Sequence, residues 1–336
     1  MSRYDLTRPE LAALVGDEPD YRARQIWEGL YRHGVAPADM TALPKALRAR
    51  LAEVPELAPA LRAEQETVAD GSTTVKWLWG LADGRRIETV LMHYGRRSTV
   101  CVSTQAGCAM ACGFCATGQA GFDRNLTTGE ILEQVVQARA EAGVQGRRLT
   151  NVVFMGMGEP LANYDRVWGA VERLHADMAL SARHLTISTV GVVPGIRRLA
   201  GERLPVNLAV SLHAADDTLR DELVPINRRY PLAVLVEACR AYLEATHRRL
   251  SFEWALIDGV NDRPVDAAHL AGLARPLAAH VNLIPLNPTP GYPTRGTPPA
   301  GVRAFQSALA SLGVNATVRR NRGTDIAAAC GQLAAR

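Results

Sequence analysis

Short runs of β-branched residues alternate with amphipathic stretches over most of this chain, and that alternation constrains the fold more than any other feature. The predicted strands are residues 99–103, 151–154, 184–188, 206–211, 250–257 and 280–285. The predicted helices between and after them are residues 128–142, 164–178, 193–200, 232–245 and 265–279. Repeated strand–helix units give a parallel sheet with right-handed crossovers, so the expected fold class is α/β. Six units do not close an eight-stranded barrel, and we expect an open, partial (βα)6 barrel with its functional residues at the strand carboxyl ends.

The amino-terminal part of the chain lies outside this pattern. Residues 1–65 carry apolar side chains at helical spacing, interrupted by prolines, which predicts a small helical accessory domain. Residues 66–95 show strand-like alternation around Asp83-Gly84, which predicts a β-hairpin extension. Residues 96–336 then form the core domain, and after a long loop rich in proline and glycine they end in a helix, a strand and a tail.

Composition excludes some classes of protein and leaves others open. Apolar residues make up 47% of the chain, which favours a large core over disorder, and no apolar run is long enough to span a bilayer. The first residues lack an apolar signal segment, so we expect a cytoplasmic protein without membrane contact. The net charge is only +4, and nearly all of the basic residues are arginine. Codon bias is the favoured explanation and a phosphate-binding surface the alternative, so composition permits an RNA substrate without establishing one.

Three cysteines, Cys108, Cys112 and Cys115, lie within eight residues and indicate a metal site. Structural zinc takes four protein ligands, and catalytic zinc rarely draws three thiolates from so short a loop. Three thiolates on a 4Fe–4S cluster instead leave one iron open to another ligand. An open iron can bind S-adenosylmethionine (SAM), so the sequence favours an iron–sulfur enzyme. A metal-binding or redox-sensing module without turnover is the alternative from a different class.

Polar residues follow several of the predicted strands and are candidates for binding SAM. Gly158 and Glu159 follow the strand at 151–154, where glycine allows close approach and a carboxylate can accept hydrogen bonds from an amino group. The other candidates at strand ends are Ser188, Ser211, Leu212, His213 and Asn287. Taken singly, each of these strand-end residues is better explained as an ordinary turn or capping residue.

Three further cysteines lie outside the cluster. Cys239 falls in an apolar helical run and is interpreted as a core residue. Cys101 lies on a strand that leads into the cysteine loop, and Cys330 lies in a glycine-flanked tail near the carboxyl terminus. Such a tail can bring a thiol back to the mouth of the barrel. Spacing alone makes this pair only a weak indication of covalent chemistry.

The Cys-x3-Cys-x2-Cys spacing, with Phe114 before the last cysteine, resembles the signature of the radical SAM superfamily. A closer resemblance, to the bacterial RlmN family of RNA adenine-C2 methyltransferases, includes both extra cysteines and runs from about residue 73 to the end of the chain. The segments that carry it are residues 101–108, 121–126, 155–161, 188–194, 211–214, 282–288 and 329–333. The amino-terminal helices match only loosely.

The resemblance implies a two-stage methyl transfer that uses two SAM molecules. Cys330 takes a methyl group from one SAM, and a radical derived from the second activates this S-methyl group for addition to C2 of adenosine. Cys101 acts as base and disulfide partner, and Glu88 occupies the position of a proton acceptor, although by sequence it is equally an ordinary hairpin carboxylate. The implied cofactors are one 4Fe–4S cluster per chain and SAM.

The same resemblance implies the partners. The substrates are an adenosine of 23S rRNA, in the peptidyl transferase region, and adenosine 37 of tRNA, while electrons come from an external donor such as flavodoxin. A monomer is expected. Two alternatives stay open at this point: a related Cfr-like enzyme that methylates C8 of the same rRNA adenosine, and a radical SAM enzyme of another reaction class.

Overall fold

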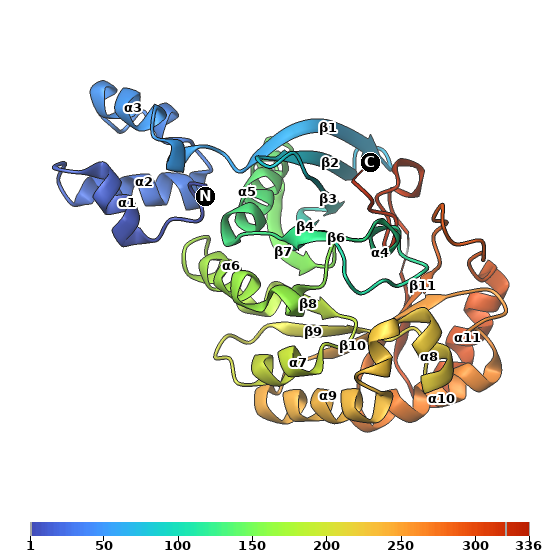
Figure 1. Ribbon diagram of the computed structural model, residues 1–336. Helices are drawn as coiled ribbons and strands as arrows, with labels where there is room; N and C mark the ends of the chain where they lie inside the picture. The colour runs from blue at the N-terminus through green and yellow to red at the C-terminus, as the bar shows by residue number, and fades with distance from the viewer. Residues whose placement is uncertain (1, 320, 336) are drawn as a thin grey trace.

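A computed structural model describes residues 2–319 and 321–335, and its centre is a curved sheet of ten strands (Figure 1). The strand order in this sheet is β1-β2-β3-β4-β7-β8-β9-β10-β11-β12, and β5 pairs with β6 separately. The strands are β1 Leu61–Ala69, β2 Thr74–Leu81, β3 Arg86–Tyr94, β4 Arg97–Cys101, β5 Gln105–Gly107, β6 Phe122–Asn125, β7 Arg148–Phe154, β8 Leu185–Thr189, β9 Asn207–Ser211, β10 Leu250–Leu256, β11 His280–Pro285 and β12 Ala316–Val318.

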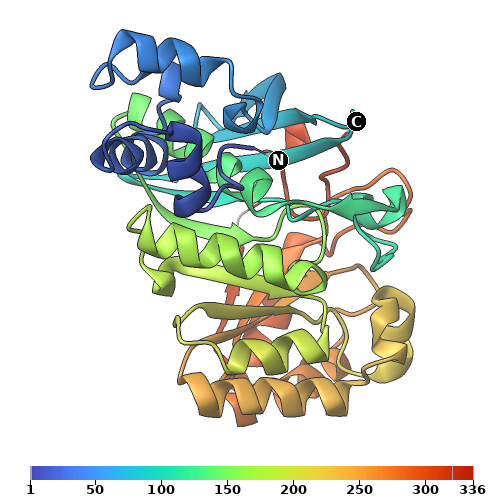
Figure 2. The ribbon, with the colours of Figure 1, turned by 60° about the vertical axis from the view of Figure 1, so that its left-hand side comes forward.

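From β4 to β12 every neighbouring pair is parallel, which confirms the predicted α/β class and open barrel. Helices follow the outer face of this curved sheet (Figures 1 and 2). The helices are α1 Arg8–Val15, α2 Tyr21–Glu28, α3 Lys45–Ala52, α4 Ala116–Ala120, α5 Thr128–Val144, α6 Tyr164–Ala176, α7 Val193–Ala200, α8 Asp217–Leu223, α9 Leu232–Thr246, α10 Pro264–Ala274 and α11 Pro299–Ser311. Short helical turns are η1 Gly29–His33, η2 Pro37–Asp39, η3 Pro55–Leu57, η4 Pro160–Asn163, η5 Ala182–His184, η6 Pro225–Arg228, η7 Arg275–Leu277 and η8 Thr324–Ile326. No helix in the described ranges is long and apolar enough to cross a membrane.

The antiparallel part of the sheet has one strand more than the predicted hairpin. β2 and β3 form the hairpin, and β1 adds to its edge through antiparallel pairing with β2. β1 begins at Leu61, inside the range that sequence patterning assigns to the helical segment. Its central residues are charged and exposed, as is common for an edge strand, so it lacks the alternation by which a strand is recognised. The predicted domain boundaries themselves stay a prediction.

Two other differences from the predicted elements have local causes. α10 ends at Ala274 rather than at residue 279, because Pro276 cannot continue an α-helix and Ala278 adopts a positive φ of 46°. α8 covers only seven residues, too few to give a clear helical period.

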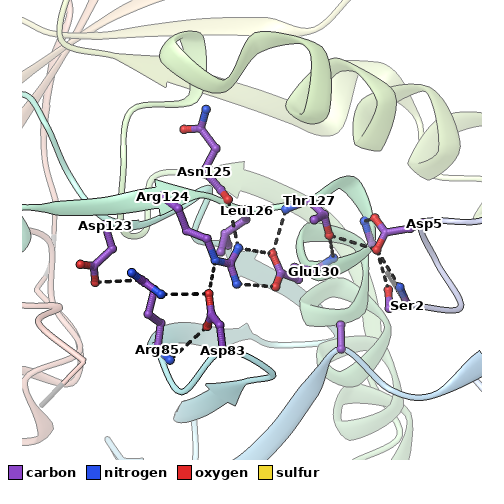
Figure 3. Close-up of polar contacts among 12 residues, drawn as sticks. Ser2, Asp5, Asp83, Arg85, Asp123, Arg124, Asn125, Leu126, Thr127 and Glu130 are labelled. Carbon is purple, nitrogen blue, oxygen red and sulfur yellow. Dashed lines mark hydrogen bonds and ion pairs between the residues drawn. The ribbon is translucent and has the colours of Figure 1, made fainter. Parts of the chain in front are cut away.

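The amino-terminal segment is attached to the core through the start of α5 (Figure 3). The Asp5 carboxylate accepts hydrogen bonds from the Gly129 N–H at 2.7 Å and from the Thr127 hydroxyl at 3.2 Å. Asp5 thereby satisfies an amide in the first turn of α5 that lacks a partner within the helix. A β-carbon at Gly129 would lie 2.3 Å from the Ser2 hydroxyl oxygen and 2.8 Å from the Asp5 backbone nitrogen, so only glycine fits this contact.

Gly129→Ala is therefore expected to displace the amino-terminal segment, whereas Gly143→Ala, in the same helix with open space around it, serves as the control. We expect the first substitution to raise hydrogen exchange of residues 2–15 by about tenfold, the loss that follows from one cap contact of about 1–2 kcal/mol. The control removes a glycine from a helix and should stabilise the protein slightly. Equal exchange in the two variants would show that the contact does not hold the segment.

Candidate active site

A cavity with an empty volume of about 1000 Å³, partly open to solvent, lies at the carboxyl ends of the parallel strands. Ten residues predicted as site residues line it: Cys108, Cys112, Cys115, Gly158, Glu159, Ser188, Ser211, His213, Asn287 and Cys330. A second cavity adjoins it and is lined by Cys101, Cys115 and Cys330 among others. Cys115 and Cys330 thus border both cavities. The predicted residues Leu212 and Glu88 do not appear in the lining of either one.

The three clustered cysteines converge on the first cavity from one loop. Burial raises the pKa of Cys108 to about 12, with smaller contributions from neighbouring acidic groups. Burial, followed by the nearby Cys115 and Cys108 thiols, also raises the pKa of Cys112. Buried thiols at this spacing need a cation to ionise. Within residues 2–319 and 321–335, however, no three His, Cys, Asp or Glu side chains are arranged to hold a single metal ion. Three thiols from one loop are a donor set of the kind that fits an iron–sulfur cluster.

The cysteine loop has a backbone that few other sequences can adopt. Ala111 has a positive φ of 53°, which is strained for a residue with a side chain. A β-carbon at Gly118 would lie 2.8 Å from the Cys112 carbonyl oxygen, so α4 packs directly against the loop only because residue 118 is glycine. The Cys108 N–H also donates to the Gly121 carbonyl at 2.6 Å.

Ion pairs attach β6, which follows the cysteine loop, to the hairpin and to α5 (Figure 3). Arg124 on β6 donates two hydrogen bonds of 2.8 Å to the Glu130 carboxylate in the first turn of α5. Its Nε donates to Asp83 in the turn between β2 and β3, and this contact lowers the pKa of Asp83 to about 2. A forked guanidinium that joins two carboxylates has a fixed geometry. The strand that follows the cysteine loop is therefore held rigidly to the hairpin and to α5.

Glu159 is buried beside the cavity with its carboxylate oriented by backbone amides. One carboxylate oxygen accepts from the Leu161 N–H and the other from the Val190 N–H, both at 2.9 Å. Burial raises the pKa of Glu159 to about 7, against the opposing effect of these hydrogen bonds. The preceding Gly158 has a φ of 98°, and a β-carbon there would lie 2.5 Å from the Gln105 side chain. A carboxylate held in this way can accept a further hydrogen bond from a cationic amino group.

The ends of β8 and β9 present two hydroxyls and an imidazole to the same cavity. The Ser188 and Ser211 hydroxyl oxygens are 3.4 Å apart. The His213 Nδ1 accepts a hydrogen bond from the Ala255 N–H at 3.0 Å, and burial lowers the pKa of His213 to about 3. The ring is therefore neutral, with its proton on Nε2. Phe114 packs edge-on against it, with ring centroids 4.8 Å apart.

Leu212 is placed differently from its neighbours Ser211 and His213. Its side chain is fully buried in the main core. Its backbone N–H donates to the Glu253 carbonyl, and its carbonyl accepts from the Arg220 Nε. Its side chain and its backbone polar groups are thus engaged within the protein, and its predicted SAM contact stays a prediction.

Arg220 on α8 is a residue that sequence reasoning missed. It is completely buried, and its guanidinium donates to the carbonyls of Leu212 at 3.1 Å and Val190 at 2.7 Å and to the Asn227 side chain at 2.7 Å. These carbonyls lie just beyond the ends of β9 and β8 and face no strand partner. Arg220 therefore fixes the two strand ends that carry Ser188 and Ser211. An arginine on a short amphipathic helix gives no sequence signal of this role.

The tail closes over the cysteine loop and brings Cys330 to the border of both cavities. The Asn287 side-chain amide donates to the Cys330 carbonyl at 3.0 Å, and the Ala116 N–H donates to the Gly331 carbonyl at 2.8 Å. The Cys330 side chain is exposed, whereas Cys101 is buried, and burial together with the nearby Cys330 raises the pKa of Cys101 to about 12. The structure thus brings both predicted thiols to one cavity.

Arg319 and Glu253 are charged residues at the same place that sequence reasoning also missed. Arg319 borders both cavities, and its guanidinium lies 4.0 Å from the Glu253 carboxylate. Cys330, Glu253 and Cys101 all raise the pKa of Arg319, against its burial. A cation in this position favours the thiolate form of either cysteine. Arg319 belongs to one of seven arginine doublets in the chain, so sequence analysis gives no reason to single it out.

Glu88 lies on β3, away from the cavity lining. One of its carboxylate oxygens is 2.8 Å from the Lys76 ammonium. The other accepts from the Ala334 N–H at 2.8 Å and the Ala335 N–H at 3.2 Å. Its contacts are thus with the hairpin and the tail.

The fold and the cysteine site define the class of protein, and comparison with known proteins agrees. Residues 102–271 match the model of the radical SAM superfamily. The chain superposes with a TM-score of 0.96 on the crystal structure of a radical SAM methyltransferase from Sphaerobacter thermophilus, at 52% identity and with both chains fully covered. The chain belongs to the radical SAM superfamily, whose members hold an iron–sulfur cluster and SAM.

The particular family follows from two close relatives. A probable dual-specificity RNA methyltransferase RlmN from Chloroflexus aurantiacus is 54% identical over 99% of this chain and 92% of its own length. A protein of the same name from Moorella thermoacetica is 53% identical, covering 96% of this chain and 93% of the relative. The chain is a member of the RlmN family and an enzyme that transfers methyl groups.

Removal of the Arg220 guanidinium is expected to destabilise the folded protein. Arg220→Met leaves the Val190 carbonyl and the buried Asn227 side-chain oxygen without donors, while the Leu212 carbonyl keeps the Ala214 N–H. We expect a loss of about 3 kcal/mol or more in the free energy of unfolding. The matched control is Arg198→Met, whose solvent-exposed pair with Asp165 is expected to contribute little to the free energy of unfolding. Urea unfolding followed by circular dichroism measures both. Similar losses in the two variants would contradict the assigned role.

Proposed function

We propose that this enzyme methylates C2 of adenosine in RNA, with 23S rRNA in the peptidyl transferase region and adenosine 37 of tRNA as its substrates. The observation that carries the proposal is the place of Cys330, which borders the cavity of the cluster cysteines and also the cavity of Cys101. Membership of a family named for dual-specificity RNA methyltransferases supports RNA as the substrate class.

The chemistry of the target explains why two thiols are needed. C2 of adenine is an electrophilic amidine carbon, so it cannot attack the methyl group of SAM as a nucleophile. The new carbon must instead reach it as a radical. When bound, a 4Fe–4S cluster held by Cys108, Cys112 and Cys115, with SAM on its open iron, supplies a hydrogen-abstracting carbon radical.

SAM is proposed to bind along the strand ends. The ionised Glu159 carboxylate accepts hydrogen bonds from the amino group of its methionine part, beside Gly158. The Ser188 and Ser211 hydroxyls, the neutral His213 ring and Asn287 line the rest of the cavity and supply donors and acceptors for ribose, adenine and carboxylate. The two backbone hydrogen bonds hold the Glu159 carboxylate in position before SAM binds.

Cys330 and Cys101 carry the carbon transfer. The Cys330 thiolate first takes a methyl group from SAM, forming a C–S bond and releasing S-adenosylhomocysteine. The methyl group then loses a hydrogen atom to the radical derived from the second SAM, and the resulting methylene radical adds to C2. The adduct gives up one electron, which replaces the electron spent on cleaving SAM. The RNA carbon is then joined to the Cys330 sulfur through a methylene group. The Cys101 thiolate takes the C2 proton and releases it to solvent, and the regenerated thiolate then attacks the Cys330 sulfur. The C–S bond breaks towards carbon, which gains a proton to become methyl, and a disulfide remains for an external two-electron reduction.

The proposed reaction also requires a reducing environment and an accessible base in the RNA. Each turnover uses two SAM molecules and ends in a disulfide, so a reducing cytoplasm and an electron donor such as flavodoxin fit the cycle. A monomer is proposed. Reaching C2 requires an unstacked base, which loops and partly unfolded RNA provide. Glu88 as a proton acceptor stays a prediction, and the C2 proton itself is assigned to Cys101.

The product identifies the reaction. RNA treated with the reconstituted enzyme, SAM and reductant should yield 2-methyladenosine on nucleoside mass spectrometry. A product that elutes as 8-methyladenosine would assign the enzyme to the Cfr-like alternative, and RNA without methyladenosine would refute the proposed reaction.

Substitution of either thiol should stop the reaction at a different stage. We expect Cys330→Ala to abolish transfer to RNA because no methyl acceptor remains. Cys101→Ala should keep the S-methyl group on Cys330 but fail to release the RNA, so a covalent protein–RNA adduct accumulates. Cys239→Ala, a buried cysteine of α9 outside both cavities, is the control and should give product. Normal yield from Cys330→Ala would place the chain in another radical SAM reaction class.

SAM affinity should depend on pH through Glu159. Its pKa near 7 means that the carboxyl group is mostly protonated at pH 6 and mostly ionised at pH 8. Because only the ionised form accepts a hydrogen bond from an ammonium group, the affinity should rise about tenfold between these values. Calorimetry on the reconstituted enzyme measures this. Glu159→Gln is expected to bind weakly at both values, and a wild-type profile in this variant would exclude Glu159 as the titrating group.

A further inference from the structure

The Glu88 carboxylate is buried, yet its surroundings differ from those of a group that acts on a substrate. Its side chain is only 5% exposed, and it lines neither of the two cavities. One oxygen faces the Lys76 ammonium at 2.8 Å, and the other accepts two backbone N–H groups of the tail. Both oxygens are therefore engaged with the protein itself.

The partner lysine places the pair on the antiparallel extension. Leu78 of β2 is paired with Glu88 of β3, so Lys76, two residues along β2, is a diagonal neighbour of Glu88 on the same face of the sheet. The Lys76 ammonium also donates to the Ala327 carbonyl at 3.4 Å. The Lys76–Glu88 pair thus contacts the tail on both sides of Cys330, at residue 327 and at residues 334–335.

The opposite side of the tail rests on the cysteine loop. The Thr117 hydroxyl of α4 donates to the Leu333 carbonyl at 2.6 Å, and the Ala116 N–H donates to the Gly331 carbonyl at 2.8 Å. The tail residues 327–335 therefore lie between the hairpin and α4, outside any strand or α-helix. Because such a segment has few backbone partners of its own, each contact with a charged group accounts for a large part of its order.

We propose that the Lys76–Glu88 pair anchors the tail, and that Glu88 is a positioning residue that sets where the Cys330 thiol stands. This inference rests on the proposed function, in which Cys330 accepts the methyl group. It assigns Glu88 a task in the first stage of the reaction, before any RNA proton is removed. A proton acceptor for C2 would act only in the second stage.

The experiment compares Glu88→Ala, Glu88→Gln and wild type in the reconstituted enzyme with unmethylated Cys330. Two quantities are measured: hydrogen exchange of the peptide that contains residues 331–335, and the rate at which Cys330 gains a methyl group from SAM without RNA, followed by mass spectrometry. We expect Glu88→Ala to raise the exchange and lower the methylation rate, each by about tenfold, as loss of hydrogen bonds to a charged group implies.

Glu88→Gln separates the two roles. Its amide oxygen can still accept from the Ala334 and Ala335 N–H groups, so we expect it to restore most of the tail protection and of the Cys330 methylation. Glu64→Ala, which removes ion pairs with Arg62 and Arg86 on the same extension without a tail contact, is the matched control and should resemble wild type.

Two outcomes overturn the inference. One is a Glu88→Ala protein whose tail exchange or Cys330 methylation equals that of wild type. The other is a pair of variants, Ala and Gln, that both methylate Cys330 normally but yield no methyladenosine, which assigns Glu88 to proton transfer. Failure of wild type to methylate Cys330 refutes the proposed function instead, and hydrogen exchange then decides on the anchor alone.

Discussion

Parallel pairing of the strands from β4 to β12 is the constraint on which the site depends. In such a sheet all carboxyl ends meet at one edge, so residues far apart in the chain become neighbours without any direct sequence relation. The pairings of Phe154 with Ile187 and of Glu253 with Ser211 set how far each strand reaches into the cavity. A shift of one residue would turn these side chains to the opposite face. The buried core below the cavity prevents that shift, because it needs the apolar residues of each strand on the inside.

The antiparallel extension and the tail form a second structural unit on this frame. β1 to β3 carry no residue of the cysteine loop, but they provide the surface on which residues 322–335 lie. Arg322 donates to the His93 carbonyl at 2.9 Å, and the Gly323 N–H donates to the Asp70 carboxylate at 2.9 Å. The extension therefore links the carboxyl-terminal tail to the sheet edge nearest Cys101. A tail held at several points can keep a thiol at the border of two cavities.

The sequence was sufficient for the fold class and for the position of most candidate site residues at the strand ends because both leave periodic or local patterns. The βα alternation and the three clustered cysteines can be read within short windows, and Gly158 to Asn287 follow predicted strand ends. Residues whose role depends on distant partners could not be found in this way. Arg220 supports carbonyls from two other strands, and Arg319 meets Glu253 only through the parallel pairing of β10, β11 and β12. β1 escaped because an exposed, charged edge strand lacks alternation.

The unequal accessibility of the two thiols determines how the proposed disulfide is reduced after each turnover. Cys330 is exposed and Cys101 is buried. An incoming reductant of the thiol type would therefore meet the Cys330 sulfur of the proposed disulfide first, which makes Cys101 the leaving group. The mixed disulfide would form on the tail rather than inside the barrel. Arg319, which lines the same cavity as both cysteines, would stabilise the departing anion.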